Sequence, residues 1–181
     1  MATLEEHQAE LRYAYVGGGP GAIVSGVMWA LAATALALKG TAFAFVVLFI
    51  GGMLIMPVSL AICIPVFRRP RPSAANPGGR IVIETLPAML FGLLLAYGFL
   101  EINEALVFPI AAMAVGTHYF PFRTSYGDIL YWVLGAVMTA IGAIGLFGIA
   151  EIPLGTAAVI AIVEIVFGII ITARNLGGPP Q

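Results

Sequence analysis

The sequence predicts an all-α polytopic transmembrane bundle of six spans, contained in a single integral membrane domain over residues 1–181. Of the 181 residues, 61% are hydrophobic and only 9% are charged, whereas about 25% of the residues of a soluble domain are charged. The apolar runs repeatedly reach the roughly 20 residues that a helix needs to cross a bilayer. Basic residues are distributed unequally among the connecting segments. These three observations decide the class before any motif is considered.

The first element is expected to be a short helix over residues 3–15, lying on the membrane surface. Thr3 and Glu6 have the spacing of a capping box, which favours the start of a helix. The acidic residues of this segment are of the wrong charge for a secretory signal, so the first span should remain in the mature protein. The next residues, 17–21, read GGGPG and predict a flexible joint. A phosphate-binding loop is the alternative, but no strand precedes these residues and no Lys-Ser/Thr pair follows them.

Six apolar segments follow, and two of the connections between them are short. Residues 39–41 and 101–104 are tight connections and require antiparallel neighbours. Residues 68–80, rich in Pro, Gly and Arg, predict a mobile loop that tolerates insertion. The spans are expected near residues 20–38, 42–67, 81–100, 105–122, 129–150 and 153–173.

The distribution of basic residues predicts that both termini are cytoplasmic. On that assignment the outer connections contain only one basic residue, Lys39. Such an excess on one side follows the positive-inside rule and requires an even number of spans. The basic residues of the inner segments are Arg12, Arg68, Arg69, Arg71, Arg80, Arg123 and Arg174.

Three titratable residues within the spans, Glu84, His118 and Glu164, are the first candidates for a functional site. A charge at the bilayer centre costs roughly 2.5–3.5 kcal/mol, so each of them needs a reason to be there. Small residues share the helical face of each one, which predicts that all three point into the bundle. Counted from the nearest inner arginine at 1.5 Å per residue, they lie about 6, 7 and 15 Å deep, respectively.

These depths place the three side chains in the cytoplasmic half of the membrane. The stretch Val107–Asp128, which contains His118, also brings Tyr119, Arg123 and Tyr126 to this level. We therefore predict a polar cluster of these residues, with Arg123 as counter-ion, lining a cavity open to the cytoplasm. The alternative is a structural role, in which Glu84 and His118 reach water by snorkelling and Glu164 is a neutral hydrogen-bond donor. Arg123 and residues 68–71 also fit a role as topology anchors.

Other kinds of site find no support in the sequence. The net charge of −1 gives no reason to expect nucleic-acid binding. One cysteine, Cys63, and two histidines predict neither a disulfide framework nor a metal site, and no cofactor is indicated. Three serines, Ser25, Ser59 and Ser125, have no base adjacent in sequence.

The chain has a short polar N-terminus, a Gly-rich joint, the run SGVMW at residues 25–29 that opens the first span, and GTHYFPF at residues 116–122 that closes the fourth. This pattern resembles a family of small bacterial multi-spanning proteins of unknown function. The resemblance covers most of the chain and implies the inner membrane of a bacterium. It implies no activity and no site residues.

The function that the sequence favours is the binding or passage of a small solute or proton through the polar cluster. A non-catalytic membrane scaffold or partner subunit is the alternative, and an intramembrane enzyme is the third. The expected partner is the lipid bilayer, and the length of 181 residues, small for a transporter, favours a homo-oligomer.

Overall fold

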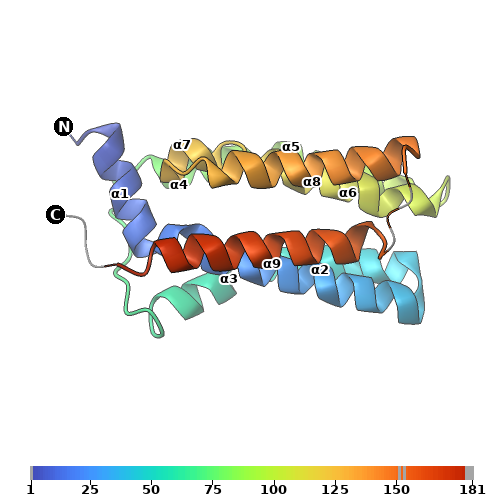
Figure 1. Ribbon diagram of the computed structural model, residues 1–181, viewed down its shortest axis with the longest axis horizontal. Helices are drawn as coiled ribbons and strands as arrows, with labels where there is room; N and C mark the ends of the chain where they lie inside the picture. The colour runs from blue at the N-terminus through green and yellow to red at the C-terminus, as the bar shows by residue number, and fades with distance from the viewer. Residues whose placement is uncertain (1, 151, 153, 178–181) are drawn as a thin grey trace.

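The computed structural model describes residues 2–150, 152 and 154–177, and in these ranges the chain forms helices and no strands. Six helical segments are long and apolar enough to cross a membrane. They lie side by side along the long axis of the molecule, and α1 and the end of α9 lie at the same end (Figure 1). The prediction of an all-α bundle with six spans is confirmed. The helices are α1 (Leu4–Ala14), α2 (Gly19–Lys39), α3 (Thr41–Cys63), α4 (Gly78–Glu84), α5 (Leu86–Gly98), α6 (Val107–His118), α7 (Phe122–Tyr126), α8 (Leu130–Phe147) and α9 (Thr156–Arg174).

Prolines account for the places where the spans end or break. The second span ends at Cys63, four residues before the expected position, because Pro65 has no N–H to continue the helix. The third span is divided into α4 and α5 at Thr85, two residues before Pro87. The fourth span is divided in the same way into α6 and α7, and Pro121 is the N-cap of α7.

Helices α2 and α9 are antiparallel and approach closely, because small residues spaced by seven positions face each other. A Cβ atom added to Gly26 of α2 would lie 2.9 Å from the carbonyl oxygen of Ala161 in α9. A Cβ atom added to Gly168 of α9 would lie 2.7 Å from the backbone nitrogen of Ile23 in α2. Without Cβ atoms the two backbones come into contact, which is how membrane helices gain dispersion energy.

Helices α6 and α8 form a second seam of the same kind. A Cβ atom added to Gly116 would lie 2.8 Å from the backbone nitrogen of Thr139. One added to Gly142 would lie 2.6 Å from the carbonyl oxygen of Pro109. The two seams hold the four helices α2, α9, α6 and α8 at positions that larger residues would not permit.

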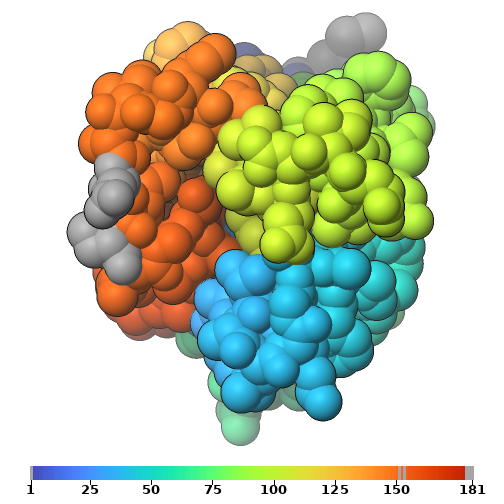
Figure 2. Space-filling view, turned by 90° about the vertical axis from the view of Figure 1, so that its right-hand side faces the viewer, coloured from blue at the N-terminus to red at the C-terminus, as the bar shows by residue number. Residues whose placement is uncertain are grey.

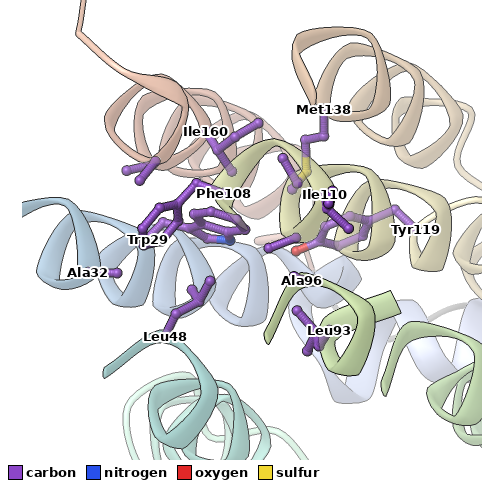
Figure 3. Close-up of a cluster of buried hydrophobic side chains, with 14 of the residues drawn as sticks. Trp29, Ala32, Leu48, Leu93, Ala96, Phe108, Ile110, Tyr119, Met138 and Ile160 are labelled. Atoms are coloured by element: carbon purple, nitrogen blue, oxygen red, sulfur yellow. The ribbon is translucent and has the colours of Figure 1, made fainter. Parts of the chain in front are cut away.

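The apolar core lies between these four helices, with contributions from α3 and α5. Figure 3 shows Trp29, Phe108, Met138 and Ile160 converging from different helices. The Trp29 and Phe108 ring centroids are 6.2 Å apart, and Trp29 is only 1% exposed. Large apolar side chains on the outward faces of α3 and α5 are exposed, as expected for faces in contact with lipid. Figure 2 shows the end opposite α1, where the short connections between helices reach the surface.

Helix α1 lies across one end of the bundle and is fixed to it (Figure 1). The predicted capping box is present: Thr3 Oγ1 accepts from the Glu6 backbone N–H, and Glu6 Oε2 accepts from the Thr3 N–H. The Gly-rich segment that follows is not a flexible joint. Gly17 and Gly18 have positive φ angles of 67° and 82°, and both pack against buried side chains. The absence of side chains at these positions allows a tight turn between α1 and α2.

The loop before α4 is attached to α1, contrary to the expectation of a mobile segment. Asn76 is buried, and its Nδ2 donates to the His7 carbonyl oxygen (3.0 Å) and to Glu10 (2.6 Å). The Ser73 backbone N–H donates to the same carboxylate at 2.6 Å. Arg69 is also buried, and its Nη2 donates to three carbonyl oxygens just after α9. The loop therefore connects α1 with the end of the last helix.

The attachment at Glu10 should depend on pH. The hydrogen bonds from Ser73 and Asn76 lower the pKa of Glu10 from 4.5, so the contribution of this contact is complete at neutral pH. It is lost as the pH falls through the lowered pKa of the folded state. In an NMR titration we expect the Ser73 amide proton to shift with a midpoint below 4.5. Glu10→Gln should remove this titration, and the same change at the exposed Glu5 should not; a midpoint at or above 4.5 would contradict the contact.

Candidate functional site

The most unusual feature of the interior is the carboxyl group of Glu164, on the face of α9 that meets α2 and α6. Glu164 is 0% exposed. The Tyr119 hydroxyl, just after α6, donates to Glu164 Oε1 at 2.8 Å. The Ser25 hydroxyl of α2 lies next to both groups. Within the described residues, Glu164 Oε2 has no hydrogen-bond partner. Three different spans thus bring polar groups to a single buried point.

A layer of stacked aromatic rings separates this point from the end of the bundle that carries α1. The rings of Tyr119 and Tyr131 stack with centroids 6.1 Å apart, and those of Tyr131 and Tyr126 with centroids 5.3 Å apart. Phe122 packs against all three. The Tyr131 hydroxyl donates to the Gly17 carbonyl oxygen at 2.6 Å, at the turn before α2. The layer therefore forms a continuous set of contacts from the Glu164 site to the turn that follows α1.

The chemistry of this site is that of a single carboxyl group with a phenol and a hydroxyl beside it. Burying an ionised carboxylate without a charged partner costs much more than burying the neutral acid. The neutral acid donates one hydrogen bond and the carboxylate only accepts, so gain or loss of a proton would change the local hydrogen bonding. Within the described ranges, no group of three His, Cys, Asp or Glu residues could hold a metal ion. Chemically, this arrangement can hold or release one proton at the carboxyl group.

His118 lies beside this site, and its ring nitrogen is engaged elsewhere. His118 Nδ1 and Thr85 Oγ1 are 2.5 Å apart, so this pair joins the fourth span to the break in the third. The His118 ring packs edge-on against Phe122 with centroids 5.1 Å apart, and its centroid is 6.3 Å from that of Tyr119. His118 thus packs against the aromatic layer. Within the part of the chain that the structure describes, its ring makes no hydrogen bond to the Glu164 carboxyl group.

Glu84 and Arg123 do not join the site, and the expectation that Glu84 points into the bundle is wrong. Glu84 is exposed, as the last residue of α4 before the break at Thr85. Its expected face came from the small residues of α5, but Ala88, the nearest of them, is exposed as well, so this face does not point into the bundle here. Arg123 is also exposed, and its guanidinium lies 5.6 Å from the centroid of the Trp132 ring, so no contact with Glu164 supports a counter-ion role.

A polar cavity lies at the end of the bundle, and Arg123 is the one residue of the predicted cluster that lines it. It has a volume of about 460 Å³, and Glu164 is not among the residues that line it. The lining residues are Arg12, Arg123, Gly127, Asp128, Ile129, Arg174 and Asn175.

Two residues of the site, Ser25 and Tyr131, were not predicted from the sequence. Ser25 has no titratable neighbour in sequence, and it reaches Glu164 only because Gly26 allows α2 to contact α9. The small residues around Ser25 in α2 could have indicated that it faces another helix, since such residues mark close contacts between membrane helices. Tyr131 fits an interfacial anchor equally well in sequence, and only the folded chain shows it to be 0% exposed.

Comparison with known proteins gives a family and no activity. A family model described as a family of unknown function, DUF7010, matches residues 4–174. A search of curated proteins and a search of solved structures gave no significant match.

Proposed function

We propose that this chain, which belongs to the DUF7010 family, is a multi-pass protein of a bacterial inner membrane that binds a proton or small cationic solute at Glu164 and passes it across the bilayer. The arginine distribution supports an orientation with both termini in the cytoplasm.

One observation carries the proposal: a carboxyl group is fully buried among apolar helices and one of its oxygens has no described partner. An ionisable residue within a membrane span is costly and most often marks a pathway for ions or protons. Packing alone would be served at lower cost by an apolar residue in this position.

The residues around Glu164 fit a reversible binding step. A proton leaving Glu164 would leave a carboxylate that accepts the Tyr119 hydrogen bond, which is stronger when the acceptor is charged. The nearby Ser25 hydroxyl can donate or accept, so it suits either form of the carboxyl group. Passage also requires that the aromatic layer of Tyr119, Tyr126 and Tyr131 open toward the end of the bundle.

The test is proton or cation flux into vesicles that contain the purified protein, measured beside thermal stability. Glu164→Gln retains the size and hydrogen-bonding capacity of the side chain and cannot release a proton, so we expect flux to be abolished and stability to be nearly unchanged. The matched control is the same substitution at the exposed Glu84, which should retain flux. Wild-type flux in the Glu164→Gln variant would overturn the proposal.

A membrane scaffold is the second candidate, favoured by the close packing around Glu164 and by the position of the polar cavity, which Glu164 does not line. For a scaffold, Glu164→Gln should change nothing, because the amide still pairs with Tyr119. Glu164→Leu should then lower the free energy of unfolding by about 1–3 kcal/mol, since it leaves the Tyr119 hydroxyl without its acceptor. Absence of flux in the wild-type protein together with this loss of stability would favour the scaffold.

A further inference from the structure

The polar cavity at the end of the bundle has a chemistry of its own, separate from Glu164. Three arginines, Arg12, Arg123 and Arg174, line a volume of about 460 Å³ together with one carboxylate, Asp128. Positive charge therefore exceeds negative charge on its walls. Guanidinium groups in such numbers match the oxygens of a phosphate group, because their N–H donors form paired hydrogen bonds with it.

The arginines retain free donor capacity. Arg12 uses Nη1 to bond the Tyr126 carbonyl oxygen at 2.5 Å, which fixes its guanidinium at the wall. Arg174 Nη1 lies 3.5 Å from Asp128 Oδ1, which is a long contact, and the Arg174 side chain is 55% exposed. Asp128 is itself engaged, since its Oδ1 accepts from the Leu130 backbone N–H at 3.0 Å. The single carboxylate thus neutralises only part of the positive charge.

The position of the cavity indicates the source of the phosphate. Arg174 is the last residue of α9, and Asp128 lies two residues before α8 begins, so the cavity is where two spans end. Lipid head groups lie at this level of a membrane protein. An apolar strip continues from the cavity along α8: Ile129, Trp132 and Val133 are 51%, 48% and 43% exposed. A free phosphate ion would make no contact with this apolar strip, whereas the acyl chains of a lipid would cover it.

We infer that this cavity binds the phosphate group of an anionic phospholipid, whose acyl chains lie along the exposed face of α8. The three arginines that line the cavity, Arg12, Arg123 and Arg174, are the groups that hold the phosphate. The lipid would hold the end of α9 beside the start of α8, next to the segment that anchors α1. This inference is independent of the role of Glu164.

Trp132 provides a local probe of the site. Its ring is exposed beside Arg123, whereas the other tryptophan, Trp29, is 1% exposed and buried in the core. The full-length chain is placed in phosphatidylcholine nanodiscs, and phosphatidylglycerol with brominated acyl chains is titrated in while tryptophan fluorescence is recorded. We expect saturable quenching at a low phosphatidylglycerol fraction, absent from Trp132→Phe and weaker with brominated phosphatidylcholine.

Paired variants separate a site from general surface charge. Each basic residue near an anionic lipid contributes about fivefold in binding, so Arg123→Gln with Arg174→Gln should raise the half-saturating phosphatidylglycerol fraction about tenfold or more. Changing both of the exposed residues Arg71 and Arg80 to Gln removes the same charge near the same end of the bundle. This double variant should leave the half-saturating phosphatidylglycerol fraction unchanged. Arg174→Gln alone serves as a control for folding. Its thermal stability, measured without phosphatidylglycerol, should match that of the wild type.

Three results would overturn the inference. They are equal responses in the two double variants, equal quenching by the two brominated lipids, and displacement of phosphatidylglycerol by inorganic phosphate in solution. The last would show that the cavity takes a soluble phosphate and not a lipid head group.

Discussion

Replacing Gly168 by leucine is expected to lower the free energy of unfolding by about 3 kcal/mol or more. A Cβ atom at this position would lie 2.7 Å from the backbone nitrogen of Ile23 and 2.9 Å from the Gly19 carbonyl oxygen. Backbone atoms do not rotate away as side chains do, so α2 and α9 would have to separate. The measurement is unfolding in detergent followed by circular dichroism.

The matched control is Gly52→Leu. Gly52 also lies within a span, in α3, and a Cβ atom there would meet nothing within 4 Å. Both variants add the same apolar side chain to a membrane helix, so helix propensity and hydrophobicity change equally. Similar stability of the two variants would show that the seam between α2 and α9 is not closely packed. Because Ser25 reaches Glu164 across this seam, Gly168→Leu should also remove any flux that depends on Glu164.

The second large effect is expected at Gly18, in the turn between α1 and α2. Its φ of 82° and ψ of 0° lie in the left-handed region, which costs a residue with a Cβ atom about 1 kcal/mol. A Cβ atom at Gly18 would also press against the Tyr131 hydroxyl and lie 3.1 Å from Cζ of Tyr126. Gly18→Ala should therefore lower the free energy of unfolding by about 2–4 kcal/mol, the sum of strain and overpacking.

Gly148→Ala isolates the packing contribution. Gly148 has a φ of 62° and a ψ of 31°, in the same backbone region, and a Cβ atom there would meet nothing within 4 Å. It should show only the strain of about 1 kcal/mol. The quantity to compare is the difference between the two alanine variants in unfolding free energy. Equal losses would mean that the tyrosine rings move aside and that the aromatic layer does not hold the turn.

The candidate site could be predicted from the sequence only in part. Helical periodicity places small residues beside Glu164, and that was enough to expect it inside the bundle, as the structure shows. The same reasoning failed for Glu84, because the helical face that it shares with Ala88 is exposed and does not point into the bundle. Tyr119 and Tyr126 were expected at the level of the cluster from depth alone. Their actual partners, Glu164 for Tyr119 and Tyr131 for Tyr126, depend on which helices are neighbours.

The sequence by itself determined the class of this protein, the number of its spans and the capped helix that precedes them. These features depend on local composition, since apolar length, caps and prolines act within a few helical turns. Only the tertiary structure decided that the Gly-rich segment is a packed turn, that the loop before α4 is attached to α1, and that three arginines form one cavity. The physical reason is that each of these features arises from contacts between residues distant in sequence. Glycines at the helix seams permit those contacts, and helical periodicity does not specify which helix lies opposite.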